Sequence, residues 1–112
     1  MPQDKDRIRL QHMLDHGTEA MQMARSRVRR DLDKDRQLNL ALVRLLEIVG
    51  EASARVTEDT KRNHPQVAWV EIAGLRNRLV HGYDDVDFDI LWDIIQLDLP
   101  PLVSTLTTIL NR

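Results

Sequence analysis

Four side chains with acid–base or anion-binding chemistry fall within eight residues of this sequence: Arg76, Asn77, His81 and Tyr83. A guanidinium holds a phosphate or carboxylate through paired hydrogen bonds, and it stays charged at any physiological pH. An ordinary imidazole titrates near pH 6.5, so it can accept or donate a proton under cellular conditions. The residue types of this stretch therefore permit proton transfer beside a bound anion.

The apolar residues around this cluster predict the helix that positions it. They recur at the spacing of a helix packed on a core, at Ala68, Ile72, Leu75 and Leu79. We predict a helix over about residues 67–81, ended by Gly82 because glycine adopts the left-handed C-terminal conformation at low steric cost. His81 should then lie on the last turn, with Tyr83 just beyond it.

The spacing of Arg76 and His81 also bears on oligomeric state. At roughly 100° per residue they lie about 140° apart around one helix, too far to grip one small group together. A second copy of the helix, crossing about a two-fold axis, would bring two arginines and two histidines to one cleft. The spacing therefore predicts a two-fold homodimer with a shared site.

The motif and the blocks around it resemble a known family. Arg76 is followed by four residues, His81, one residue and Tyr83. The flanking blocks are LLEIVGEA at 45–52, His64-Pro65 and Trp69 before the motif, and DLPPL at 98–102 after it. This ordered set is similar to the HepT-like branch of the HEPN superfamily over about residues 36–104.

The resemblance implies a fold and an activity. The expected fold is all-α, a HEPN-like up-and-down bundle of four to five helices that forms a homodimer. The expected function is the toxin of a toxin–antitoxin system, a ribonuclease with Arg76 and His81 as catalytic residues. Its partner would be a minimal nucleotidyltransferase antitoxin that silences the toxin by attaching AMP to Tyr83. Glu51, in a block that the family places near the active helix, is a candidate supporting residue or else a surface acid.

Such a site needs neither a metal nor a cofactor, because RNA carries its own nucleophile, the 2′-hydroxyl. A neutral imidazole takes the hydroxyl proton, a protonated one serves the leaving 5′-oxygen, and a guanidinium stabilises the phosphorane between them. The expected product is a 2′,3′-cyclic phosphate, with Asn77 orienting the phosphate or His81. An ordinary phenol titrates near pH 10 and is a poor base at neutral pH, so Tyr83 is not an obvious catalyst, and its role as the AMP acceptor is what the resemblance implies.

Composition sets bounds on the whole chain. Its 112 residues fit a single helical domain spanning 1–112, and the 42% apolar content with few aromatics favours packed helices over a sheet. The net charge of −2 means that RNA binding must rest on a local positive patch. The absence of cysteine excludes disulfides and a thiolate nucleophile. With no apolar run near membrane-spanning length and no signal-type N-terminus, we expect a cytoplasmic protein.

The densest basic run, residues 25–30, should end a first helix that begins near Asp4. A solvated helix end is the simplest role, and the alternative is contact with RNA or a partner through Arg27, Arg29 and Arg30. Arg78 is likewise either a phosphate contact or a solvated charge. His12 and His16 have a spacing that can hold a metal, but without further ligands we expect no metal there.

The rest of the chain predicts three further helical segments with short connections. A second helix should span about residues 36–62, with Gly50 allowing close helix–helix approach. Asp87 should cap a short helix that Pro100-Pro101 ends, and a last helix should cover about 101–110. The sequence is also compatible with a second function, that of a non-catalytic HEPN module that docks a nucleotidyltransferase or a nucleotide.

Overall fold

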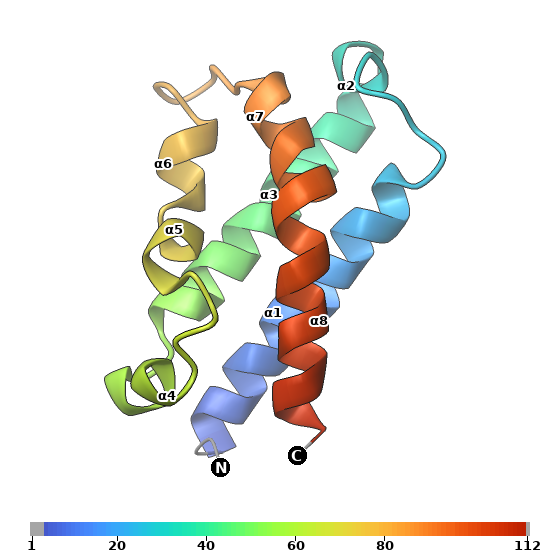
Figure 1. Cartoon of the computed structure of the whole chain (residues 1–112). Coiled ribbons are helices and arrows are strands. Elements are labelled where there is room, and N and C mark those ends of the chain that lie inside the picture. The colour runs from blue at the N-terminus through green and yellow to red at the C-terminus, as the bar shows by residue number, and fades with distance from the viewer. Residues whose placement is uncertain (1–3, 112) are drawn as a thin grey trace.

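Two long antiparallel helices form the centre of the protein in this computed structural model, which describes residues 4–111. They are α1 (Asp4–Ala24) and α3 (Arg36–Ala54), and α8 (Leu99–Leu110) packs on α1 (Figure 1). Residues 1–3 of the expected domain and Arg112 lie outside the described part. The described termini lie at the same end of the bundle, as expected for an even number of up-and-down layers (Figure 1).

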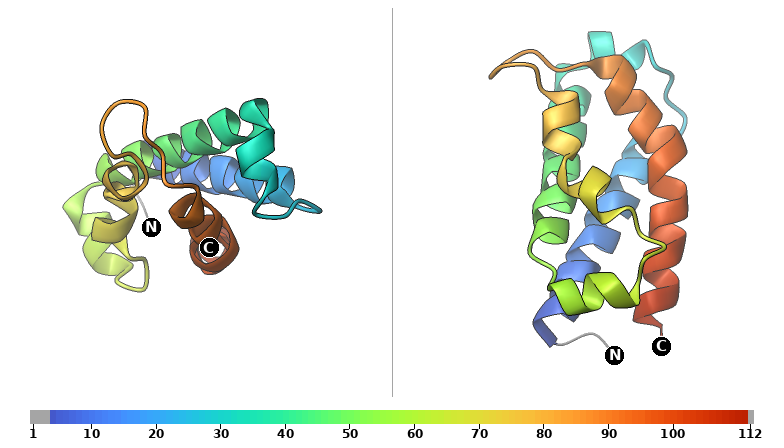
Figure 2. Two further views of the ribbon diagram at one scale, coloured as in Figure 1. Left: turned by 90° about the horizontal axis from the view of Figure 1, so that it is seen from above. Right: turned by 60° about the vertical axis from the view of Figure 1, so that its left-hand side comes forward.

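Shorter helices complete the bundle. The segment beside α3 consists of α5 (Trp69–Ala73) and α6 (Leu75–Leu79), and it runs back up the molecule (Figure 2). The final layer is one continuous helical run of α7 (Phe88–Asp93), the π-helical turn η1 (Ile94–Asp98) and α8. Two connecting helices lie at the ends of the bundle, α2 (Asp31–Lys34) and α4 (Glu58–Asn63). The prediction of an all-α fold is confirmed, although several of the predicted helices are divided into shorter ones.

The core between these layers is aliphatic. Its largest fully buried side chains come from α1, α2, α3, α6 and the final run, including Leu10, Met13, Leu32, Leu42, Leu46, Leu79, Leu91, Leu99 and Leu106. Gly50 makes the predicted close approach, because a Cβ at this position would lie 3.0 Å from the carbonyl oxygen of Ile72. The glycine thus sets how closely α5 can approach α3.

The first predicted helix is too long at its C-terminal end. It stops at Ala24 and not near Arg30, because Ser26 adopts a left-handed backbone conformation, with φ +67°, that a helix cannot contain. Residues 25–30 form a corner that leads into α2. The basic run therefore lies on a turn just beyond the C-terminus of α1, and not within the last turn of that helix.

The second predicted helix is also wrong at its end. It stops at Ala54, and α4 begins separately after Thr57. The cause is a long-range contact, because Asp6 of α1 accepts hydrogen bonds from the backbone N–H of Thr57 at 3.1 Å and from its hydroxyl at 2.5 Å. Thr60 donates to the same carboxylate at 2.6 Å. Asp6 thus serves as a substitute cap for α4 from another helix.

The predicted helix over 67–81 is shorter and is divided. It begins at Trp69, whose indole N–H donates to the carbonyl of His64 at 3.0 Å, and it is interrupted at Gly74, a poor helix former. It ends at Leu79, because Val80 turns to an extended conformation and pairs with Val86 in an antiparallel β-bridge. The prediction that Gly82 ends this helix is therefore wrong.

The proline pair does not end the preceding segment. Pro100 and Pro101 lie in the first turn of α8, where the N–H groups that proline lacks are not needed in the helix. The π-helical turn before them connects the two helices, with the N–H of Leu99 bonded to the carbonyl of Ile94, five residues earlier. Asp87 does cap α7 as predicted, by accepting from the backbone N–H groups of Asp89 and Ile90.

No helix in the described part of the chain combines the length and the apolarity that a membrane crossing requires.

Candidate active site

Arg76 lies on the outer face of α6 and is held by a glutamate from another helix. Leu75 and Leu79 bury the inner face of α6 against the core, which turns residues 76–78 outward. The Nε–H of Arg76 donates to Oε2 of Glu47 on α3 at 3.0 Å. The side chain of Arg76 is 62% exposed, whereas that of Glu47 is 20% exposed. The guanidinium is therefore anchored on one side and open to solvent on the other.

His81 and Tyr83 lie on a short hairpin that follows α6. The Val80–Val86 bridge closes it, and the N–H of His81 donates to the carbonyl of Asp85 at 2.6 Å. Gly82 has a φ of +88°, so the left-handed conformation expected of this glycine occurs in the turn of the hairpin. His81 is exposed at the base of the turn and not on the last helical turn, as the sequence had predicted.

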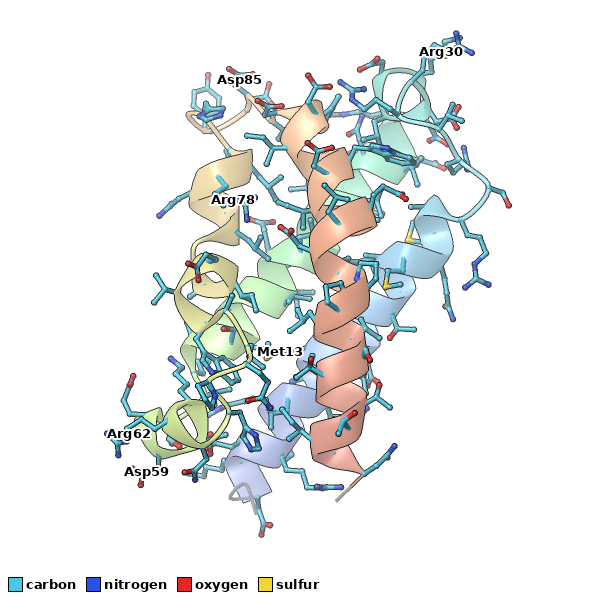
Figure 3. The ribbon with its side chains drawn as sticks, in the orientation of Figure 1. Met13, Arg30, Asp59, Arg62, Arg78 and Asp85 are labelled. Atoms are coloured by element: carbon cyan, nitrogen blue, oxygen red, sulfur yellow. The ribbon has the colours of Figure 1, made fainter. Side chains whose placement is uncertain are left out.

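Tyr83 lies at the tip of this hairpin and is 98% exposed. Asp84 and Asp85 beside it are also exposed. Figure 3 shows Asp85 at the upper end of the molecule, above α6 and Arg78. The turn thus presents a phenol hydroxyl to the outside, at the same end of α6 as His81.

Arg78 faces a different surface from Arg76. Its guanidinium donates to Oδ2 of Asp98 in η1 at 3.4 Å, which bridges α6 and the final helical run. This pair borders a largely apolar groove of about 460 Å³, lined by residues of both segments such as Ile72, Leu75, Ile94 and Leu102. Two arginines that lie two residues apart on one helix are therefore paired with carboxylates on opposite sides.

Among the described residues, neither Glu51 nor Asn77 forms a hydrogen bond or an ion pair with Arg76, so their site roles stay predictions. Asn77 is exposed on α6. Glu51 lies 3.9 Å from Arg44 and borders a shallow hollow of about 360 Å³ between α1 and α3, with Lys5 and Arg9 across from it. The sequence did contain a signal for the acid that does reach Arg76: Glu47 precedes Glu51 by one helical turn in the same block.

The arginines of the basic run at residues 25–30 differ in their contacts. Arg29 donates to Asp89 at 2.7 Å and to Asp33 at 3.1 Å, and it lies over the ring of Phe88. Burial alone would lower the pKa of Arg29, but these two carboxylates raise it above its usual value. Arg29 therefore ties the α1–α2 corner to α7.

The other two candidate arginines of the run differ from Arg29. Arg27 pairs with Asp35 at 3.3 Å, across the same corner. Arg30 is exposed and projects outward at the corner near α2, across the top of the molecule from Asp85 (Figure 3). Of the three predicted contacts, Arg30 thus has the geometry most open to an external phosphate.

The histidine pair on α1 is arranged for local hydrogen bonding. Nδ1 of His16 lies 2.7 Å from the carbonyl oxygen of His12, and the two rings meet edge to face. Within residues 4–111, no three His, Cys, Asp or Glu side chains gather as a metal site would require.

Comparison with known proteins bears on the function of the candidate site. A protein named "Probable ribonuclease HepT" from Thermococcus cleftensis is 43% identical over 68 residues, which cover 61% of this chain. The alignment spans 62% of that protein, less than two thirds of its length. A protein named "Putative RNase" from Caldanaerobacter subterraneus subsp. tengcongensis is 39% identical over 82 residues, 73% of each chain. No solved structure matches the chain.

The chain also matches a family as a whole. The family model described as "Ribonuclease HepT-like" matches residues 13–109, which include α3, the exposed Arg76, the hairpin and the final helical run. The arginine, histidine and tyrosine that the resemblance singled out thus lie inside the matched region, on one exposed segment. The chain belongs to the HepT-like ribonuclease family.

Proposed function

We propose that this protein is the ribonuclease toxin of a toxin–antitoxin system and that it cuts RNA without a metal. The observation that carries the proposal is the exposure of Arg76 and His81 on adjacent segments of a HepT-like chain. His81 takes the proton of the 2′-hydroxyl and returns one to the 5′-oxygen, and Arg76 binds the phosphate as negative charge builds on it. The 2′-oxygen bonds to phosphorus as the 5′-oxygen leaves, which gives a 2′,3′-cyclic phosphate.

The test is RNA cleavage by the purified protein in EDTA. We expect cleavage to persist in the chelator, since neither group needs a metal. His81→Ala and Arg76→Ala should each lower the rate by about 10²–10⁴-fold, the usual effect of losing one positioned acid–base or charge-stabilising group. Their helical circular dichroism should stay unchanged because both side chains are exposed. Wild-type cleavage that EDTA abolishes, or His81→Ala cutting at the wild-type rate, would contradict the mechanism.

The proposed control of the toxin acts through Tyr83. A minimal nucleotidyltransferase antitoxin transfers AMP from ATP to the phenol oxygen, which releases pyrophosphate. The exposed hairpin tip leaves room for this enzyme's pocket around the hydroxyl. The added phosphate brings negative charge beside the position that an RNA phosphate must occupy, and so blocks binding by repulsion and bulk.

A second function has one specific observation in its favour. Asp84 and Asp85 stand beside His81, and the whole chain carries a net charge of −2, which together oppose the approach of RNA. A non-catalytic module that docks a nucleotidyltransferase or a nucleotide would tolerate this acidity. The cleavage assay separates the two functions, because the binding module leaves RNA intact while still binding its partner.

A further inference from the structure

In the described part of the chain, Glu47 is the only residue that forms a hydrogen bond with the side chain of Arg76. The two residues are 29 positions apart in sequence, so tertiary packing brings them together. The contact is made through Nε of the guanidinium at 3.0 Å, with a carboxylate that is largely shielded from solvent.

The helix that carries Glu47 is among the most firmly packed parts of the fold. Its neighbours on α3, Leu46 and Val49, are fully buried. One turn further along α3, Gly50 lets the backbone of α5 approach closely. A Cβ at Gly50 would lie 3.0 Å from the carbonyl oxygen of Ile72. The distance from α3 to the α5–α6 layer is therefore fixed, and with it the distance from Glu47 to Arg76.

Because Glu47 bonds to Nε of Arg76, the other nitrogens of the guanidinium remain available to a ligand. A guanidinium has five N–H donors, and bonding through Nε leaves its two terminal nitrogens to form the fork that grips a phosphate. Arg78 gives a contrast on the same helix, because it bonds Asp98 through a terminal nitrogen and so commits part of its fork. The terminal nitrogens of Arg76 form no hydrogen bond with a described residue, and 62% of the side chain is exposed.

We propose that Glu47 is a positioning residue, which holds the terminal nitrogens of Arg76 toward the scissile phosphate of RNA. The inference rests on the proposed ribonuclease function and assigns to it a residue that does not touch the substrate. A flexible, exposed arginine must otherwise be ordered at each catalytic turn, and misplacement of a charged group by about 1 Å can cost a hundredfold in rate.

The Glu47–Arg76 pair could also affect the cleavage rate in the opposite direction. The negative charge of Glu47 partly cancels the charge that Arg76 offers to a phosphate. If this cancellation dominated, removing the carboxylate would strengthen RNA binding and raise the cleavage rate. If positioning dominates, removing it lowers kcat even though a negative charge near the RNA has gone. The direction of the change in kcat therefore distinguishes the two.

The experiment measures kcat and KM of RNA cleavage for Glu47→Gln and Glu47→Ala. We expect kcat to fall by about 10- to 100-fold in Glu47→Ala and by less in Glu47→Gln, whose amide oxygen can still accept from Nε. KM should stay within about twofold of the wild type or decrease. Glu58→Gln, which removes a carboxylate 3.8 Å from Lys61 on α4, is the matched control and should leave both constants unchanged.

A double variant tests whether Glu47 acts through Arg76. Under single-turnover conditions with enzyme in excess, adding Glu47→Ala to Arg76→Ala should cost no further rate, because the group to be positioned is already absent. A full further loss in the double variant would overturn the inference. So would an unchanged or raised kcat in both single variants at Glu47.

Two further readouts separate this role from folding and from the proposed function. Thermal unfolding of Glu47→Gln should differ from the wild type by no more than a few degrees, because the glutamine oxygen can still accept from Nε and the arginine end of the pair is 62% exposed. If the wild type cuts RNA but the Glu47 variants match it, the positioning role alone fails. If the wild type cuts no RNA, the ribonuclease function fails and the role of Glu47 with it.

Discussion

At the scale of single residues, the exposure of Tyr83 decides what a modifying enzyme can reach. A phenol that is 98% exposed makes little contact with the rest of the chain, so changing its hydroxyl should not disturb packing. The hairpin that carries it is closed by the Val80–Val86 bridge and has Gly82 in its turn. The residue is therefore held at a defined place without being buried.

We predict that Tyr83→Phe stays nucleolytic but escapes silencing. The variant keeps the ring and loses the oxygen that would accept AMP. Incubation of the wild type with a cognate nucleotidyltransferase, ATP and Mg²⁺ should add the mass of AMP to Tyr83 and stop cleavage. Mass spectrometry of the intact protein and its peptides makes the measurement.

The result of the same assay can contradict the prediction in two ways. AMP on another residue, or none in a toxin that the antitoxin has neutralised, would reject this form of control. An inactive Tyr83→Phe in the absence of the antitoxin would instead assign the hydroxyl a direct part in binding or cleavage.

At the scale of elements, Asp6 connects α1 to the start of α4. Its side chain is fully buried, and burial alone would raise its pKa. Hydrogen bonds from Thr57 and Thr60, with Arg9 nearby, outweigh burial and lower the pKa of Asp6 below its ordinary value of 3.8. The ionised form is therefore the one that stabilises the fold.

We predict that Asp6→Asn lowers the free energy of unfolding by about 1–3 kcal/mol at pH 7, the range for hydrogen bonds to a charged group. The contribution of Asp6 is full above the ordinary carboxyl pKa and is lost as pH falls through the lowered folded-state pKa. The gap between wild type and variant should therefore shrink below about pH 4. Urea unfolding at pH 7 and pH 3 measures it.

Asp59→Asn is the matched control for Asp6. Asp59 is exposed and ion-paired with Arg62 inside α4, and Figure 3 shows both residues at the outer edge of the molecule. An exposed pair of this kind contributes about 0–1 kcal/mol, so this variant should change stability little at either pH. An equal loss of stability in both variants would mean that the hydrogen bonds of Asp6 between α1 and α4 contribute no more to the free energy of unfolding than an exposed ion pair does.

Two helical glycines give a second prediction at this scale. Gly17 would place a Cβ 3.4 Å from a methyl carbon of Val103, which is a side chain that can move, whereas Gly50 faces a backbone oxygen at 3.0 Å. Gly50→Ala should lower the free energy of unfolding by about 1–3 kcal/mol through overpacking. Gly17→Ala should be neutral or stabilising by up to about 1 kcal/mol, because alanine favours the helix. Thermal and urea unfolding compare them, and equal effects would contradict the close approach of α5 to α3.

At the scale of the whole molecule, we expect two chains to share the proposed site. Arg76 leaves the outer face of α6, whereas His81 lies beyond the end of that helix, after Val80 has turned away into the hairpin. We predict that the protein is a two-fold homodimer whose cleft combines Arg76 from one protomer with His81 from the other. Light scattering at micromolar concentration should give twice the mass of the chain.

Mixing two inactive variants tests the shared cleft directly. Arg76→Ala and His81→Ala homodimers should each be inactive, but mixed dimers keep one intact arginine and one intact histidine on opposite chains. We expect cleavage to reappear after the two variants are unfolded together and refolded. A monomer that still cuts RNA, or mixed dimers as inactive as their parents, would contradict the model.

The boundaries of the helices show where prediction from sequence ended. The type and number of the main layers follow from local apolar periodicity, because the 3.6-residue repeat is a property of each segment alone. The ends of the layers depend on distant residues instead. Asp6 stops α3 from continuing into α4, and the Val80–Val86 bridge draws His81 out of the helix.

The candidate site, too, could be predicted from the sequence only in part. The spacing of Arg76, His81 and Tyr83 is written in the sequence, and so is their place in the HepT-like ribonuclease family. Which carboxylate holds Arg76 was decided only by packing. Glu47 and Glu51 lie one turn apart in one block, and the distance between α3 and α6, set by Gly50 and the buried leucines, brings the first of them to the guanidinium. Local spacing fixes which residues can act, and the approach of separate helices fixes which of them meet.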